Sequence, residues 1–308
     1  FYSCDLLQKV VLPETIISIG DYAFAYCSVS DIVLPDSLVS IGMYAFEYCD
    51  FYQINIPINV ETLSSKVFYM CSNLEKVVYS AKNCKTVGKE VLSRNLSYLY
   101  VESSVEYISG NLFGTIHNLF YDTNNLTNCN VLTGYSTLTV GKNVKTIPSF
   151  LGSPSLLSVY FDENSQLESI GEYGFSGCVS LTSIIIPETV TTIGTKAFNE
   201  CKNLFEINIH DNITTIGDFA FYNCTNLTSI NTGNQVTKID KYAFSNCSNL
   251  AEITISDSVT TIGVYTFGYC ENIVKLTIGK GVTSVSGSSF GYMRGLEEIN
   301  YNATNHTS

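Results

Sequence analysis

The stretch IGDFAFYNCTNLTSI, residues 216–230, decides the fold, because nearly the same phrase follows it twice. It returns as IDKYAFSNCSNLAEI at 239–253 and as IGVYTFGYCENIVKL at 262–276. A catalytic motif is normally needed once, whereas repetition at a fixed spacing indicates a unit that stacks on copies of itself. The sequence therefore predicts a repeat protein.

Two columns of like residues run through the repeats at a spacing of 22 or 23 residues. The phenylalanine column consists of Phe24, Phe46, Phe68, Phe175, Phe198, Phe221, Phe244, Phe267 and Phe290. Three residues later comes a cysteine column, which consists of Cys4, Cys27, Cys49, Cys71, Cys178, Cys201, Cys224, Cys247 and Cys270, with Met293 in the next slot. Because one coil cannot bury its apolar face alone, we expect both columns to stack as structural ladders.

Each phrase leads into a short β-branched segment whose alternation predicts a strand. Aligning these segments gives one inward-facing residue per strand, namely Val10, Ile32, Ile54, Val77, Leu99, Leu119, Leu138, Val159, Ile184, Ile207, Ile230, Ile253, Leu276 and Ile299. The sequence thus predicts a solenoid of about 14 coils of 22–23 residues, dominated by short parallel strands, with few or no regular helices. Helical repeats are disfavoured because their periods are about 33 residues or more.

The spacing of the strands separates regular from irregular coils. The regular coils cover residues 1–79 and 167–301. Between them, in 80–166, the strand spacing falls to 20, 19 and 21, then rises to 25, and both columns are broken. We expect a single solenoid over 1–308, and, because the chain opens with FYSC inside a repeat, a fragment of a longer protein.

The repeated pattern L-x-x-I-x-I-P, followed by I-G-x-x-A-F-x-x-C, resembles the BspA-like subclass of leucine-rich repeats, named for surface proteins of Bacteroides-type bacteria. Its clearest matches are residues 10–76 and 167–301. The resemblance implies a right-handed, curved, α/β-type solenoid whose sheet lines the concave side. It also implies a cell-surface or secreted protein of bacteria or some parasitic protists, in a family associated with attachment to host matrix proteins and to other cells.

Composition excludes several classes of partner. Lys and Arg total 16 against 28 Asp and Glu, so the net charge is −12. This is the wrong sign for nucleic acid or for an anionic membrane surface. No stretch approaches the roughly 20 apolar residues that would cross a bilayer. An apolar fraction of 45% is nevertheless ample for a core.

The 11 cysteines raise the question of disulfides or metal. Residues stacked in register project the same way, so we expect neighbouring column sulfurs to be buried free thiols and not bridges. Metal binding is disfavoured, because the sequence has no C-x-x-C and its only histidines, His117, His210 and His306, lie in unrelated coils. Cys84 and Cys129 lie off the column and are the candidates for reactivity.

The sequence gives little support to an enzyme, and no cofactor is expected. It lacks the metalloprotease, phosphate-loop, EF-hand and dinucleotide motifs. GSSFG, residues 287–291, fits the G-x-S-x-G pattern. Ser289 nevertheless occupies the alanine column of the repeat, where a packed interior position is expected. A glycan-processing enzyme would need paired carboxylates in a cleft, whereas Glu206, Glu252 and Glu298 are expected on alternate coils of an open surface.

An aromatic patch is the candidate binding site. On each strand, residues that alternate with the inward ones face outward. In the irregular coils these positions collect Tyr98, Tyr100, Phe120 and Tyr160, with Val78 alongside. Exposed tyrosines on a rigid surface are typical of protein or glycan contact sites. Two alternatives stay open: the aromatics pack against one another to support shortened coils, or the segment 122–136 covers them.

These observations favour a non-enzymatic, extracellular or cell-surface adhesion module that binds a host-surface or matrix protein through its concave face. A glycan is a further candidate partner, whereas nucleic acid and membrane insertion are not expected. The alternative function is a structural stalk or scaffold that presents other domains. Open sheet edges at exposed end coils predict a monomer, or weak end-to-end self-association at high concentration.

Overall fold

The computed structural model describes residues 1–92, 95–109, 112–126, 132, 134–149 and 153–303. The chain divides into two compact units, Phe1–Asn143 and Val144–Ser308. Both consist of short parallel strands joined by turns, and the described residues contain no helix. No described segment could therefore cross a membrane as a long apolar helix. The parallel-strand solenoid expected from the sequence is confirmed.

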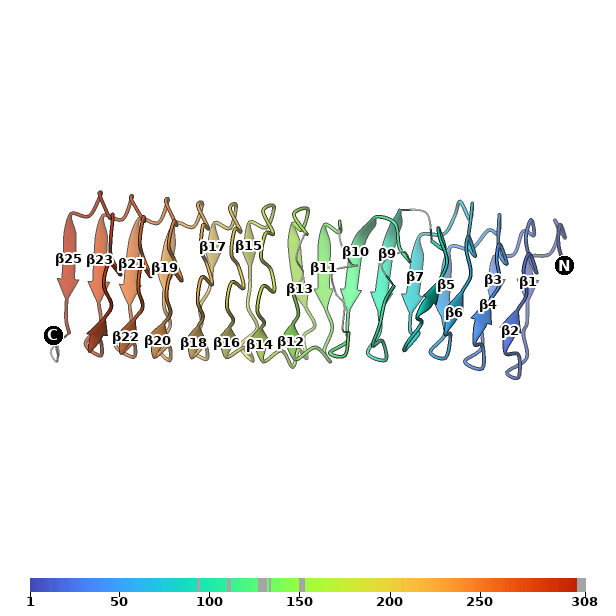
Figure 1. Cartoon of the computed structure of the whole chain (residues 1–308), viewed down its shortest axis with the longest axis horizontal. Coiled ribbons are helices and arrows are strands. Elements are labelled where there is room, and N and C mark those ends of the chain that lie inside the picture. The colour runs from blue at the N-terminus through green and yellow to red at the C-terminus, as the bar shows by residue number, and fades with distance from the viewer. Residues whose placement is uncertain (93–94, 110–111, 127–131, 133, 150–152, 304–308) are drawn as a thin grey trace. The chain divides into compact units, whose positions relative to one another are not determined.

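Each complete turn supplies one strand to each of two series, which can be followed in Figure 1. In the first unit the first series is β1 (Lys9–Val10), β3 (Asp31–Ile32), β5 (Gln53–Ile56), β7 (Lys76–Tyr79), β9 (Leu96–Val101), β10 (Ile116–Tyr121) and β11 (Thr137–Val140). The second series of this unit is β2 (Ser18–Ile19), β4 (Ser40–Ile41), β6 (Thr62–Leu63) and β8 (Thr86–Val87).

The second unit repeats this arrangement. Its first series is β13 (Ser158–Phe161), β15 (Ser183–Ile184), β17 (Glu206–Ile207), β19 (Ser229–Asn231), β21 (Glu252–Ile255), β23 (Lys275–Ile278) and β25 (Glu298–Tyr301). Its second series is β12 (Thr146–Ile147), β14 (Ser169–Ile170), β16 (Thr192–Ile193), β18 (Thr215–Ile216), β20 (Lys238–Ile239), β22 (Thr261–Ile262) and β24 (Ser284–Val285).

The chain makes about 12 turns, slightly fewer than the fourteen coils expected. Among the described residues each of the fourteen expected positions lies on a first-series strand, but β9, β10 and β25 are not followed by a second-series strand. In the irregular coils the first-series strands instead lengthen to six residues at β9 and β10. The shortened spacing therefore reduces the second series and leaves the first in place.

The inward positions expected from the sequence lie opposite one another in neighbouring strands. Ile54 pairs with Val77, and Val77 pairs with Leu99. In the second unit Ile253 pairs with Leu276 in the same way. All five side chains are buried. The alternation of inward and outward residues thus sets the register, because a slip by one residue would expose the whole apolar column.

The second series was not expected from the sequence, and it explains the glycine column of the consensus. Gly42 directly follows β4, at a close approach between adjacent coils. A Cβ on Gly42 would lie 2.5 Å from the backbone N of Asp21 and 2.5 Å from the carbonyl C of Gly20. Only a residue without a side chain fits there unless the coils move apart.

We therefore expect Gly42→Ala to destabilise the first unit by about 1–3 kcal/mol, the usual cost of forcing extra atoms into a packed position. Urea unfolding of the variant measures this loss. Gly20→Ala is the matched control, because a Cβ on Gly20 would meet nothing within 4 Å. An equal loss in both variants would show that close approach between coils is not the reason for the glycine.

The phenylalanine column forms the centre of the core. In the second unit the Phe221 ring lies 5.2 Å from the Phe198 ring and 5.0 Å from the Phe244 ring, centroid to centroid, with interplanar angles of 5° and 4°. All three side chains are fully buried. At this distance each ring packs directly against the ring of the next coil. The column thus couples neighbouring coils.

The cysteine column has a polar role as well as an apolar one. The Cys224 thiol donates a hydrogen bond to the carbonyl of Phe198 in the preceding coil, with an S to O distance of 3.2 Å. Cys247 does the same to Phe221 at 3.3 Å. The ten described cysteines are free, and Cys129 lies outside the described residues. In these coils a small side chain with a donor therefore satisfies a buried carbonyl.

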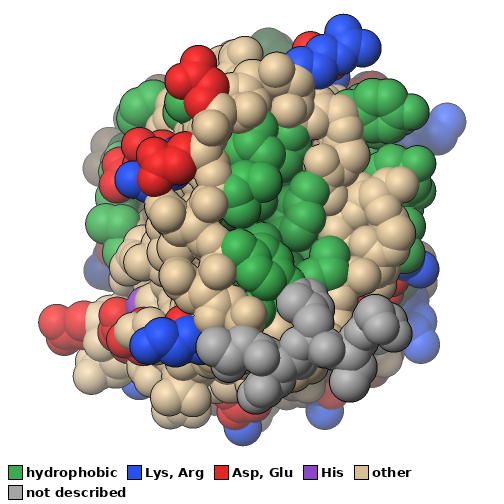
Figure 2. All heavy atoms as spheres, turned by 90° about the vertical axis from the view of Figure 1, so that its left-hand side faces the viewer, with side chains coloured by type: hydrophobic (Ala, Val, Ile, Leu, Met, Phe, Trp, Pro, Cys, Tyr) green, Lys and Arg blue, Asp and Glu red, His purple; other side chains and the backbone are tan. Residues whose placement is uncertain are grey.

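The interior of a coil is seen where Figure 2 views the molecule from the C-terminal side. Apolar side chains fill the middle of this face, and charged side chains lie around its rim. On β25, Ile299 is 55% exposed and Tyr301 is 44% exposed, although both occupy inward columns. At this end the core is an apolar centre with a charged rim around it.

Candidate functional site

Part of the expected aromatic patch comes together on the first strand series of the first unit. Val78 of β7 pairs with Tyr100 of β9, and Tyr100 pairs with Phe120 of β10. These three side chains therefore form one row across three neighbouring strands. Tyr98 lies two residues before Tyr100 on β9 and is 42% exposed. We call Val78, Tyr98, Tyr100 and Phe120 the aromatic row.

Two rings of the aromatic row pack against each other. The Tyr100 and Phe120 rings lie 5.5 Å apart with an interplanar angle of 33°, and both are half-buried. The Lys76 ammonium lies 4.6 Å from the centre of the Tyr100 ring. The idea that these aromatics support one another thus holds for Tyr100 and Phe120. Tyr98 is exposed to solvent, and Tyr100 and Phe120 each keep part of their surface exposed.

Acidic side chains border the aromatic row. A cavity of about 280 Å³ lies between Val78, Tyr100 and Phe120 on one side and Glu102 and Asp122 on the other. Ser80 donates a hydrogen bond to Glu102 Oε2 at 2.5 Å. The main-chain and side-chain amides of Asn143 donate to Asp122 at 2.9 and 2.8 Å. The acids are therefore held in fixed positions beside an apolar surface.

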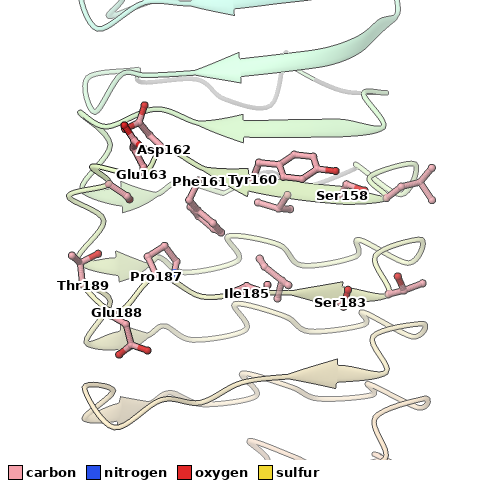
Figure 3. A pocket seen from close by; sticks show the side chains of 15 residues that line it. Ser158, Tyr160, Phe161, Asp162, Glu163, Ser183, Ile185, Pro187, Glu188 and Thr189 are labelled. Carbon is pink, nitrogen blue, oxygen red and sulfur yellow. The ribbon is translucent and has the colours of Figure 1, made fainter.

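Tyr160, the remaining patch residue, belongs to the second unit. It lies on β13, is 59% exposed, and lines a groove of about 660 Å³ between β13 and β15. Figure 3 shows the strands on either side of this groove, with Tyr160 on one and Ile185 beside the other. Tyr160 therefore lines a hollow that we call the β13–β15 groove.

The groove exists because the first series opens between these two strands. β15 pairs with β17, and no pairing joins β15 to β13 among the described residues. The second series stays closed behind it, since β14 pairs with β16 in register. The longest strand spacing of the chain, 25 residues from Val159 to Ile184, falls at this opening. At this point the second strand series is thus continuously paired, whereas the first series is interrupted.

Sequence reasoning missed a second set of aromatics in the turns that carry the phenylalanine column. Rings two positions before or after the phenylalanine stack between coils. The pairs and their centroid distances are Tyr22–Tyr44 at 5.0 Å, Tyr26–Tyr48 at 4.9 Å, Tyr242–Tyr265 at 5.4 Å and Tyr269–Tyr292 at 4.4 Å. These stacked rings turn their edges to solvent. The signal in the sequence was the pair of tyrosine positions that flank the phenylalanine.

These turn residues adopt an unusual backbone conformation. Tyr22 and Tyr26 have φ values of 54° and 58°, in the left-handed region that costs a residue with a side chain about 1–2 kcal/mol. The Tyr22 N–H donates to the carbonyl of Met43 at 2.9 Å, and the Tyr26 N–H donates to that of Glu47 at 2.8 Å. Hydrogen bonds to the next coil thus offset the strain, and the same turn can recur in every coil.

The candidates for chemistry are placed in structural roles. Ser289 is 2% exposed, and its hydroxyl donates to the carbonyl of Gly263 at 2.7 Å. Cys84, expected to be reactive, is instead fully buried, and burial raises the pKa of its thiol to about 11. The thiolate that would react is therefore disfavoured. No group of three metal-ligating side chains occurs among the residues that the structure describes.

The chain matches the sequence profile of the BspA-type leucine-rich repeat region, a profile of six repeat copies, over residues 1–120, 114–250 and 168–297. This chain belongs to that family. BspA-type repeats therefore cover regular and irregular coils alike. Leucine-rich repeat proteins are typically non-catalytic, and membership supports a protein-interaction or scaffold module. No curated protein matches the chain.

Solved leucine-rich repeat structures resemble this BspA-type chain. A leucine-rich repeat protein from Bacteroides ovatus is 25% identical with a TM-score of 0.54, and the match covers 99% of this chain and 70% of that one. A leucine-rich repeat protein from Eubacterium ventriosum is 22% identical with a TM-score of 0.48, over 100% and 80%. A leucine-rich cell-surface protein from Faecalibacterium prausnitzii is 20% identical with a TM-score of 0.41, over 97% and 89%.

Proposed function

We propose that this chain is a non-enzymatic adhesion module of a cell-surface or secreted protein, and that it binds a host-surface or matrix protein through the outward, concave face of its first strand series. The aromatic row carries the proposal. It offers aromatic area, a border of fixed carboxylates and a rigid parallel sheet beneath. Aromatic side chains on such a surface supply much contact area at small entropic cost.

Two further observations support the proposal. The net charge of −12 suits proteinaceous partners with basic surfaces and disfavours nucleic acid. A structural neighbour from Faecalibacterium prausnitzii is described as a leucine-rich cell-surface protein. A structural stalk or scaffold remains the second candidate function, since a solenoid can space other domains without using its faces. A stalk would be indifferent to changes in the aromatic row.

The test is capture of proteins from matrix and epithelial-surface extracts by the immobilised chain. We expect wild type to retain a partner, and the combined variant Tyr98→Ser, Tyr100→Ser and Phe120→Ser to bind it about 30-fold or more weakly, as hot-spot aromatics do. Surface plasmon resonance with the purified partner measures the ratio.

The control is Tyr48→Ser, because Tyr48 is 44% exposed, much like Tyr98, but lies in a turn outside the first strand series. Circular dichroism must show that both variants remain folded. If no partner is retained, or if the aromatic-row variant binds as wild type does, the adhesion proposal fails in favour of the stalk.

A further inference from the structure

The β13–β15 groove leaves two inward side chains partly exposed. Val159 and Phe161 occupy the inward columns of β13 but are only half-buried. The corresponding residues of β21, Ile253 and Ile255, are each 1% exposed. Among the described residues β13 has no strand paired with it on the side of β15. Figure 3 shows the Phe161 ring in the gap, on the side that faces Pro187.

Apolar groups also form the outer part of the groove. Ile185 is 82% exposed, Tyr160 is 59% exposed and Leu157 is 55% exposed. They surround the gap in which Phe161 lies. Apolar surface of this kind, gathered around a hollow of about 660 Å³, has the size of a ligand-binding site. The middle of the groove thus offers a seat for an apolar side chain.

One end of the groove is acidic. Asp162 and Glu163 follow β13, and Glu188 lies in the turn after β15. No Lys or Arg lines the groove, and no ion pair joins Asp162 or Glu163 to a described basic residue. Glu188 contacts His210 Nδ1 at 3.4 Å and accepts a hydrogen bond from Asn212 at 3.2 Å. The acidic end therefore attracts a cationic group.

The width of the opening limits how a ligand can lie. Neighbouring strands of a sheet are about 4.8 Å apart, so a strand inserted between β13 and β15 would need a separation of roughly 9.6 Å. Cα atoms of the two strands approach within 8 Å. A ligand therefore cannot insert as a strand between β13 and β15. It must lie over the groove and reach into it with side chains.

The apolar middle and the acidic end are separated by a fixed length. Tyr160 and Glu163 are three residues apart along one side, and Ile185 and Glu188 are three residues apart along the other. Three residues of extended chain span about 10 Å. A ligand that fits both parts must present an apolar group and a cation at this separation and on one face. A polyproline II segment does this, because it has three residues per turn and rises about 9 Å per turn, whereas a β-strand turns residues three apart to opposite faces.

We propose that the β13–β15 groove binds a peptide segment in the polyproline II conformation that carries an apolar side chain and, three positions away, a lysine or arginine. The apolar side chain enters the gap beside Phe161 and Ile185. The cation lies between Asp162, Glu163 and Glu188. This inference rests on the proposed function, and it adds a second contact site with a defined class of partner segment.

The test uses labelled peptides and fluorescence polarisation with the full chain. Each peptide places Phe, Tyr, Leu or Ile three positions before or after Lys or Arg in a Ser/Thr background. Reference peptides replace the cation by Glu or the apolar residue by Ser. We expect wild type to bind members of the first series and neither reference series, and to bind them more weakly as salt is raised.

Three variants locate the site. Ile185→Lys, at an exposed position, should weaken binding about tenfold or more by repelling the cation and closing the apolar seat. Combined Asp162→Asn, Glu163→Gln and Glu188→Gln should weaken it about 3- to 30-fold and reduce its salt dependence. Val33→Lys is the matched control, because Val33 in DIVLP (31–35) corresponds to Ile185 in SIIIP (183–187) and is 74% exposed.

Several outcomes would overturn the inference. Peptide binding could be absent up to about 1 mM, the weakest affinity of interest. Ile185→Lys and Val33→Lys could alter binding equally, or the Ser references could bind as well as the apolar peptides, which would indicate attraction to acidic charge alone. Sedimentation could show a dimer that Ile185→Lys disrupts, which would assign the groove to a second copy of the chain.

The proposal for the groove and the proposal for the aromatic row can be contradicted independently. A chain that captures a surface partner but binds no peptide in a groove-dependent way keeps the proposed function and loses this inference. A chain that binds peptides in the groove but captures no surface partner keeps the groove and loses adhesion as its function. The aromatic-row variant should bind the peptides as wild type does.

Discussion

Replacement of Phe221 by alanine is expected to lower the free energy of unfolding of the second unit by about 3–5 kcal/mol, the range for large aromatic side chains removed from a core. Phe221 is fully buried and stacks on Phe198 at 5.2 Å and on Phe244 at 5.0 Å. Its removal opens a cavity that two coils share. In a repeat protein the damage spreads to both neighbours, because stability resides in the interfaces between coils.

Urea unfolding followed by circular dichroism measures this loss. Phe205→Ala is the matched control, since Phe205 lies in the same unit and is 56% exposed. An exposed site of this kind should change stability by less than about 0.5 kcal/mol. A loss below about 1 kcal/mol for Phe221→Ala would mean that the coils collapse onto the space and that the phenylalanine column is not the element that couples them.

The sequence was sufficient to predict the first strand series. Ile54, Val77 and Leu99 were placed in one column from spacing alone, and they pair in register. The reason is physical: alternation has a period of two residues, so a stacked apolar column tolerates no slip. Even in the irregular coils Leu99 pairs with Leu119, because the inward residue is fixed by burial and not by coil length.

The second strand series, and the positions at which pairing in the first series is interrupted, could not be predicted from the sequence. Two-residue strands such as β4 carry too short a pattern to be recognised, and the close approach at Gly42 shows only in three dimensions. The opening between β13 and β15 coincides with a spacing of 25 residues. However, β3 and β5 are also unpaired at a spacing of 22, so spacing alone does not predict an opening.

The candidate site was predicted in composition but not in arrangement. Outward columns correctly placed Val78, Tyr100 and Phe120 in one row, because parallel strands keep equivalent residues on one face. Their mutual packing and the assignment of Tyr160 to a groove depend on how the strands part. Cys84 was chosen as a candidate for reactivity because it lies off the cysteine column, but it is fully buried all the same.

The second large effect concerns alkaline pH and the buried thiols. In the second unit burial raises the thiol pKa of Cys178 and Cys270 to about 12, and raises the pKa of Cys201, Cys224 and Cys247 well above its ordinary value. Unfolded thiols ionise near pH 8.5. Between these values the native state retains protons that the unfolded state has lost, so stability falls as pH rises.

Each such thiol lowers the free energy of unfolding by about 1.4 kcal/mol per pH unit above pH 8.5. Five thiols together lower it by up to about 7 kcal/mol per unit, which is comparable to the whole stability of a typical domain, about 5–15 kcal/mol. We therefore expect stability to be nearly constant from pH 7 to 8, as far as thiols determine it, and cooperative unfolding between about pH 9 and 11.

Circular dichroism across this range, together with thiolate absorbance, should show unfolding and thiol ionisation in one transition. Cys224→Ala should reduce the slope of stability against pH by about 1.4 kcal/mol per unit, since it removes one titrating group. Thr225→Ala, next in the chain and without a titratable side chain, should leave the slope unchanged. Retention of the fold to pH 11 with ionised thiols would contradict the argument, because it would mean that the Cys column tolerates charge among stacked phenylalanines.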